Sequence, residues 1–301
     1  MRRAARVAGF GLAGAIAVGA LVLCVAGGCS NAGYYWQSAR GHLDILARAK
    51  PVQQWLDDPA TSQPLRERLL LTQQLRDYAV AQMKLPDNRS YRSYTQLDRP
   101  AALWNVAAAP ELSLTLKTWC FPVAGCVAYR GYYAQGEALA EAQQLRAQGF
   151  DAVVQSIPAY STLGWFDWLG GDPLLSSFVR LPEGELARLI FHELAHQVVY
   201  AKDDTEFNES FATAVERIGG RRWLAERAGP DARREYAQYD ERRKELRQLL
   251  RATRERLAAV YRSDTADDAK RAAKAQALQA LRDHYETLKR ERWGGWAGFD
   301  A

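Results

Sequence analysis

The chain has 301 residues, of which 48% are hydrophobic, 11% aromatic and 25% charged, a composition that excludes collagen-like, low-complexity and disordered classes. Forty Lys and Arg residues stand against 35 Asp and Glu residues, with both signs interspersed, so the net charge of +5 is no electrostatic footprint for nucleic acid. Four cysteines are too few for a disulfide-rich scaffold. We therefore expect an ordinary buried core and no nucleic-acid partner.

The first 28 residues have the pattern of an export signal. Three arginines precede an uncharged apolar stretch from residue 7 to 26, which is typical of a secretory signal peptide. The stretch ends Ala-Gly-Gly-Cys-Ser, which resembles a bacterial lipoprotein cleavage site. We expect residues 1–28 to be removed and Cys29 to become a lipid-modified N-terminus that faces the periplasm, with Ser30 favouring the outer membrane. An uncleaved membrane helix is the alternative, since about 20 apolar residues can cross a bilayer.

Helical and strand patterns alternate in the first half of the mature chain. Apolar residues recur at helical spacing over about 34–57 and 63–85, which predicts two packed helices. Short apolar or alternating runs separated by Pro and Gly predict a small antiparallel sheet over 100–133. A helix is predicted over 137–148, followed by one more strand over 152–157.

Cys120 and Cys126 lie within this strand-rich region, in the segment WCFPVAGCVAYRGYY. Pro122 and Gly125 allow the chain to reverse between two strand-like segments, and an oxidising periplasm favours closure of the loop. We predict a structural disulfide between them. Metal binding is the alternative, but no third and fourth soft ligands lie nearby in the sequence.

The second half begins with a Gly-rich and aromatic stretch over 159–180, whose length inside a compact domain is typical of a functional loop. Pro182, followed by two glutamates, predicts the start of a helix that runs to about Ala201. A second helix is predicted from about Thr205 to the glycine pair Gly219-Gly220.

The C-terminal part has charged residues alternating with Leu, Ala and Tyr at helical spacing, over 231–262 and again over 265–292. This pattern predicts a long helical hairpin that supports the rest of the fold. We therefore predict an α+β, predominantly helical fold, with residues 29–301 forming a single domain.

The sequence HELAH in the first helix of the second half is the chemically distinctive motif. His192 and His196 are four residues apart, so both imidazoles project from one helical face and can meet one metal ion. Glu193 lies beside that face, where its carboxylate can reach a water at the metal without becoming a ligand. Apolar neighbours, among them Val198 and Val199, predict a buried helix, in which two histidines and a glutamate are costly unless a cation satisfies them. The alternative is an ordinary helix that carries HExxH by chance.

The next helix, TEFNESFATAVE, supplies a third ligand. A catalytic zinc site needs three protein ligands and an open fourth position. Twelve residues separate His196 from Glu209, enough for one helix to end, turn, and lay a second helix across it. We predict Glu209 as the third ligand, and Asn208 as a residue that orients the site rather than a ligand.

The segment NESFA resembles the glutamate-bearing segment of gluzincins, the thermolysin-like and aminopeptidase-N-like zinc peptidases. The gap of twelve residues is shorter than the usual one in that group, the exopeptidase motif GAMEN is absent, and Val199 and Lys202 exclude metzincins. Together with GCSNAGYYWQSARGHL, TWCFPVAGCVAYRGYY and IPAYSTLGWFDW, the motifs are similar over nearly the whole mature chain to a bacterial family of predicted zinc-dependent aminopeptidases, many of them lipoproteins. The resemblance implies a zincin-like metallopeptidase domain, one Zn²⁺ ion and hydrolysis of peptides or proteins.

The implied mechanism uses a water whose pKa zinc lowers toward about 7, with Glu193 as general base and then general acid. Tyr160 and Tyr200 are the predicted oxyanion donors, Tyr200 because it lies four residues past His196. Strand 152–157 is predicted to bind an extended peptide along its edge.

An aminopeptidase also needs a carboxylate for the substrate ammonium, and four residues qualify without a ranking: Asp172, Asp203, Asp204 and Glu206. The alternatives are a zinc endopeptidase and a catalytically idle zinc-binding lipoprotein whose C-terminal hairpin binds a partner. Glu193 argues against the idle form, because a purely structural zinc site has no use for a base beside its ligands.

Overall fold

The computed structural model describes residues 32–121, 125–159, 162, 167 and 170–300. Contacts between residues divide the chain between Ala47 and Arg48, and the described part of the first unit is most of helix α2 (Ala32–Arg48). The predicted export signal and Cys29 lie outside the described residues. Within the described ranges, no helix combines the length and the apolar character needed to cross a bilayer.

The predicted helix over 34–57 is wrong in its continuity. Helix α2 ends at Arg48, Lys50–Pro51 form the short strand β1, and helix α3 covers Val52–Asp57. Pro51 has no N–H to donate within a helix, so it ends one element and precedes the first turn of the next. Helix α4 (Gln63–Ala81) packs on α3 and ends four residues earlier than predicted.

The strands form three small sheets in the described part of the chain. Strand β3 lies at the centre of an antiparallel sheet between β6 and β7, while β4 and β5 form a separate hairpin. Strand β2 pairs antiparallel with β1 and parallel with β8. The residue ranges of these strands are β2 (Ser93–Thr95), β3 (Leu103–Pro110), β4 (Trp119–Phe121), β5 (Gly125–Val127), β6 (Arg130–Tyr132), β7 (Phe150–Ile157) and β8 (Leu174–Leu175).

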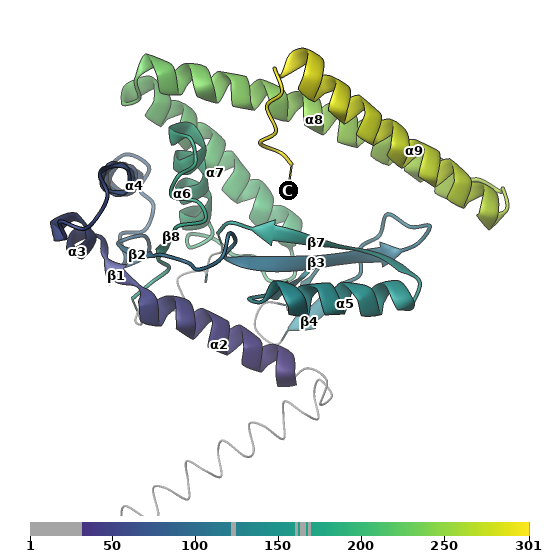
Figure 1. Ribbon diagram of the computed structural model, residues 1–301, viewed down its shortest axis with the longest axis horizontal. Coiled ribbons are helices and arrows are strands. Elements are labelled where there is room, and N and C mark those ends of the chain that lie inside the picture. Colours follow the sequence, from purple (N-terminus) through teal and green to yellow (C-terminus); the bar gives the residue numbers. More distant parts are fainter. Residues whose placement is uncertain (1–31, 122–124, 160–161, 163–166, 168–169, 301) are drawn as a thin grey trace, which may run out of the picture. The chain divides into compact units, whose positions relative to one another are not determined.

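The central sheet is covered on one face by helix α5 (Gln135–Ala147), as Figure 1 shows. Side chains alternate along β3, so Trp104, Val106 and Ala108 are buried while their neighbours are partly exposed. Ala138, Ala142 and Leu145 are the buried residues of α5, at helical spacing. The predicted alternation of strand and helix in this region is confirmed, although its strands belong to two sheets rather than one.

Helices α6 (Glu183–Ala195) and α7 (Thr205–Glu226) pack closely against each other. Helix α6 ends six residues before the predicted end. The prediction that Val198 and Val199 help to bury the helix is wrong, because both lie beyond its end and are 48% and 40% exposed.

The glycine pair does not end α7, which continues to Glu226. A Cβ on Gly219 would clash with the Met83 side chain and lie 2.9 Å from Cδ2 of Phe191, and a Cβ on Gly220 would lie 2.9 Å from Cγ of Arg188. Both glycines are buried and face α6. The pair therefore serves close helix packing, a role that outweighs the low helix propensity of glycine.

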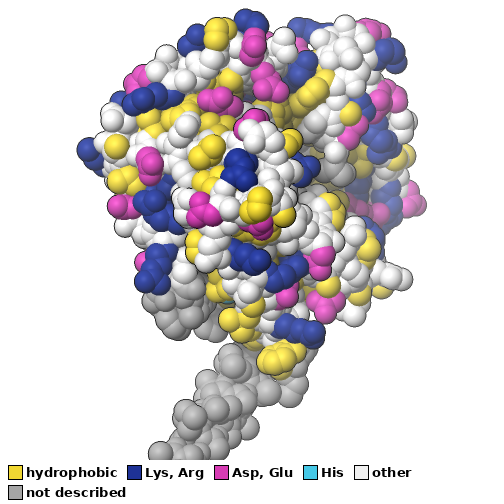
Figure 2. All heavy atoms as spheres, turned by 60° about the vertical axis from the view of Figure 1, so that its left-hand side comes forward, with side chains coloured by type: hydrophobic (Ala, Val, Ile, Leu, Met, Phe, Trp, Pro, Cys, Tyr) yellow, Lys and Arg dark blue, Asp and Glu magenta, His cyan; other side chains and the backbone are white. Residues whose placement is uncertain are grey.

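Helices α8 (Pro230–Arg262) and α9 (Asp267–Thr287), with a terminal π-helical turn η3 (Leu288–Arg292), confirm the predicted C-terminal hairpin (Figure 1). Arg271 pairs with Glu111 and Lys274 with Asp151, which ties α9 to the ends of β3 and β7. On the face drawn in Figure 2, basic and acidic side chains are interspersed.

Candidate metal centre

The last turn of α6 and the first turns of α7 bring three donor atoms together. Nε2 of His192 lies 3.1 Å from Nε2 of His196, and the Glu209 carboxylate oxygens lie 3.3 Å from the first nitrogen and 3.7 Å from the second. All three ligand atoms fall within 4.8 Å of one another. His192 lies inside α6, His196 caps its C-terminal end, and Glu209 lies on α7.

This geometry fits a tetrahedral zinc ion. Donors about 2.0–2.1 Å from such an ion lie about 3.4 Å from one another, and the observed separations bracket that value. Nδ1 of His192 is 3.0 Å from the Glu216 carboxylate and is therefore assigned the proton, which leaves its Nε2 as a lone-pair donor. The structure thus brings His192, His196 and Glu209, the three predicted ligands, to one point.

The site is open on the Glu209 side. The side chains of His192 and His196 are 18% and 10% exposed, whereas that of Glu209 is 53% exposed. The two imidazoles therefore face the protein interior, and the carboxylate faces solvent. Solvent therefore reaches the donor set from the side of Glu209.

Glu216 is the residue of the site that sequence reasoning missed. It lies two helical turns after Glu209 on α7, and its second carboxylate oxygen contacts Arg188. A carboxylate on the outer nitrogen of a ligating histidine fixes the ring orientation and raises its basicity. The spacing of seven residues from Glu209, which places both glutamates on one helical stripe, was the available signal.

The charges around the donors shift their proton equilibria in the metal-free protein. Burial lowers the pKa of His192, but the hydrogen bonds that its ring donates to Glu209 and Glu216 outweigh burial and raise that pKa to about 10. Burial and the neighbouring His192 cation lower the pKa of His196, and the hydrogen bond from His192 lowers the pKa of Glu209. A metal ion must displace the His192 proton to bind.

Glu193 lies on α6 next to the first ligand. Burial raises the pKa of its carboxyl to about 7, and the negative charges of Asp172 and Glu209 act in the same direction against His192. A carboxyl group with a pKa near neutrality can both accept and return a proton at physiological pH. The environment of Glu193 therefore suits the predicted base.

The connection between the two helices is held by polar side chains. Asn208 is 4% exposed and clamps the backbone of Ala201, accepting from its N–H at 2.7 Å and donating to its carbonyl oxygen at 2.8 Å. Asp204 caps α7 by accepting from the N–H of Phe207 at 2.9 Å. Asn208 is thus a positioning residue for the loop that separates His196 from Glu209.

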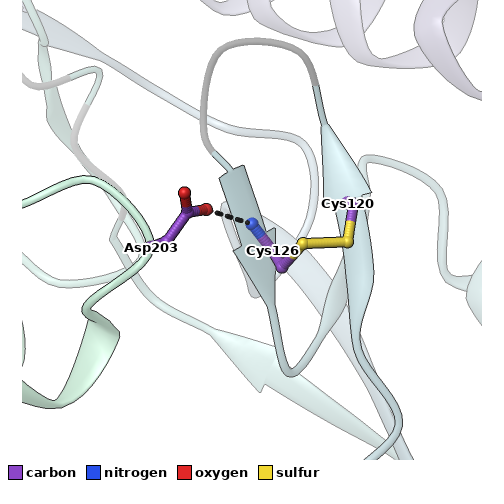
Figure 3. The surroundings of a disulfide bond; sticks show 3 residues. All are labelled: Cys120, Cys126 and Asp203. Atoms are coloured by element: carbon purple, nitrogen blue, oxygen red, sulfur yellow. Dashed lines mark hydrogen bonds between the residues drawn. A yellow bond between two sulfur atoms is a disulfide. The ribbon is translucent and has the colours of Figure 1, made fainter.

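A disulfide joins Cys120 on β4 to Cys126 on β5 (Figure 3). Asp203, in the loop between α6 and α7, accepts a hydrogen bond of 3.0 Å from the backbone N–H of Cys126. Gly125 has a φ of +73°, and a Cβ there would lie 3.0 Å from Cγ of Asp203. The disulfide hairpin therefore supports the loop that carries the chain from one metal ligand to the next.

The acidic residues and tyrosines predicted for the site differ in burial and in their contacts. Asp172 is buried and accepts from Thr162, while Asp203 and Asp204 have the contacts described above. Glu206 is exposed in the first turn of α7. Tyr160 lies outside the described residues, and the helical argument for Tyr200 is wrong because α6 ends before it.

The sequence matches the family described as "Putative aminopeptidase" over residues 33–301. The chain belongs to this family. The predicted resemblance to an aminopeptidase family is thereby confirmed, and the family description names a peptidase activity. Comparisons with curated proteins and with solved structures found no match.

Proposed function

We propose that this member of the family is a zinc-dependent peptidase with a preference for substrates that have a free amino terminus. The observation that supports the proposal best is the convergence of His192, His196 and Glu209 at separations that suit a tetrahedral ion. The amino-terminal preference rests on the family description alone. The zincin-like fold remains a prediction from the motifs.

The chain's own residues divide the work around the ion. When bound, the zinc ion polarises a carbonyl group and makes water a better nucleophile at neutral pH. His192, His196 and Glu209 would hold that ion, and Glu216 would fix the orientation of the His192 ring. Glu193 accepts the proton of the attacking water and passes it to the leaving amine.

The substrate is proposed to lie along β7. This strand is at the edge of its sheet, in the order β6-β3-β7 of the described strands. An edge strand offers backbone N–H and C=O groups to an extended peptide. Val153, which is 59% exposed, lies on this strand.

The test combines metal analysis with two matched substrates. Purified wild-type protein is expected to hold one zinc ion per chain and to hydrolyse amino-acid anilides faster than their N-acetylated forms, with loss of activity in a chelator. E193Q is expected to retain zinc and to lose activity by a factor of about 10² to 10⁴, the contribution of a general base. Undiminished hydrolysis by zinc-loaded E193Q would refute the mechanism. Equal rates on free and blocked substrates would favour an endopeptidase, and zinc without any hydrolysis would favour the idle scaffold.

We further propose that the protein is exported and anchored through lipid at Cys29, facing the periplasm of a bacterial cell. The arginine, apolar and small-residue pattern supports this, as does the disulfide between Cys120 and Cys126, because disulfides persist in oxidising compartments. Labelled palmitate is expected in the wild-type protein and not in C29A. Label that persists in C29A would exclude this anchor.

A further inference from the structure

A chain of buried ion pairs runs from the metal centre to the C-terminal hairpin. The Glu216 carboxylate that holds His192 also contacts a guanidinium nitrogen of Arg188. Another nitrogen of Arg188 lies 3.9 Å from Oε1 of Glu185. The other oxygen of Glu185 contacts Arg243, which belongs to α8.

These side chains are shielded from solvent along the whole chain of contacts. The side chains of Glu216, Arg188, Glu185 and Arg243 are 13%, 10%, 13% and 15% exposed. Electrostatic interactions between such groups are screened far less than those at a surface. A change of charge at one end therefore alters the electrostatic energy of the next ion pair.

Arg188 contacts the carboxylates of both Glu216 and Glu185, and the Glu185 carboxylate can accept a further hydrogen bond. Oε1 of Glu185 is buried and accepts no hydrogen bond from the described residues. Without Arg243, Arg188 is the cation left to neutralise Glu185, and its hold on Glu216 weakens.

Close packing fixes Arg243 in its place. A Cβ on Gly184 of α6 would lie 3.0 Å from Cγ of Tyr236, so the two helices meet where Glu185 and Arg243 face each other. The guanidinium carbon of Arg243 lies 4.9 Å from the centre of the Tyr239 ring, and one of its nitrogens is 3.4 Å from Asp240. The C-terminal hairpin therefore places the guanidinium group of Arg243, in a fixed orientation, beside the first turn of α6.

We propose that Arg243 is a positioning residue for the metal centre: it neutralises Glu185, which keeps Arg188 on Glu216 and thereby holds the His192 ring in its ligating orientation. The inference rests on the proposed zinc site. It gives the C-terminal hairpin a role in metal affinity, beyond that of structural support.

The experiment is a double-mutant cycle in the full chain, read out as the zinc dissociation constant in competition with a chromophoric chelator. Substitutions of residues behind a ligating histidine weaken binding by about 10–100-fold, and R243M, one step further away, is expected to weaken it about 5–10-fold. The double variant E185Q/R243M is expected to return to within about twofold of wild type, because the carboxylate that competes for Arg188 has lost its charge. R242M is the matched control, since Arg242 lies next in sequence and stacks on Trp296 without reaching Glu185.

Helix content and Tm are recorded for each variant. Should R243M fail to fold, R243K takes its place; it keeps the charge but not the planar fork, and is expected to weaken binding about twofold to threefold. Wild-type affinity in a folded R243M, or in R243K where that stands in, overturns the proposal, as does a double variant no better than R243M. A wild-type protein that binds no zinc overturns the proposed function and this inference together, whereas zinc binding that is insensitive to Arg243 overturns this inference alone.

Discussion

The proposed metal centre is expected to depend on Glu216, a side chain that is not one of the proposed ligands. Its carboxylate contacts Nδ1 of His192 at 3.0 Å and Arg188 on its other oxygen. We expect E216Q to weaken zinc binding by about 10–100-fold, because the amide removes the charge that supports the ring and its orientation. Zinc affinity measured by chelator competition checks this. E226Q, the same change near the end of the same helix, is expected to bind zinc as wild type does, and equal affinities of all three proteins would contradict the role of Glu216.

The contact that Asp203 makes is expected to stabilise the folded protein. Its carboxylate accepts from the N–H of Cys126 at 3.0 Å, and its backbone has a φ of 62°. D203A removes the acceptor and places a Cβ-only residue in the left-handed region, at a cost of about 1–3 kcal/mol. D203N keeps an acceptor oxygen and tolerates that backbone. Thermal unfolding is expected to show a lower Tm for D203A than for D203N, and equal values would exclude this contact as a support for the loop.

At the scale of helices and strands, α6 and α7 hold the site together through residues that have little side chain. G219A is expected to destabilise the protein by about 1–3 kcal/mol, because the added methyl would clash with the Met83 side chain, lie 2.9 Å from Cδ2 of Phe191 and overpack the interface. For a protein of this size the Tm falls by about 2–5 °C. G229A, where nothing lies within 4 Å of the added Cβ, is the control and is expected to unfold near the wild-type temperature. A Tm of G219A equal to that of G229A would show that the interface has room.

The same helices show which features could be predicted from the sequence. Local spacing was enough to predict His192, His196 and Glu209 as a set, because two ligands share one helical face and the third opens the next helix. Boundaries depended on tertiary contacts: α7 passes through Gly219 and Gly220 because they pack on α6, and α6 stops at Ala195. Helix propensity alone predicts neither the continuation of α7 nor the end of α6.

The residues that contact the proposed ligands could not be predicted from the sequence, because their pairing also depends on tertiary contacts. Glu216 and Arg188 come from different helices, and Arg243 lies 55 residues after Arg188 in the chain. Charged residues are frequent in all three helices, so no single spacing distinguishes these three from their solvated neighbours. Their pairing depends on how α8 packs against α6, which the hydrophobic pattern of a charged hairpin does not specify.

At the scale of the whole molecule, the proposed zinc ion would join two helices, and its binding would compete with a proton. The pKa of about 10 at His192 lies above the ordinary value of 6.5, so the bound proton stabilises the metal-free protein fully below pH 6.5, and this stabilisation is lost as the pH rises toward 10. Zinc must displace that proton at any pH below about 10, so its affinity falls about tenfold for each pH unit of acidification.

The rise in Tm produced by zinc is therefore expected to be larger at pH 8 than at pH 6. A hundredfold difference in affinity corresponds to about 2.7 kcal/mol, which for a protein of this size amounts to about 4–5 °C. Thermal unfolding with zinc and with chelator at both pH values measures the two shifts. H192A, which lacks the titrating ligand, is expected to show a small shift with little dependence on pH. A wild-type shift of the same size at pH 6 and pH 8 would mean that no proton leaves His192 when the metal binds.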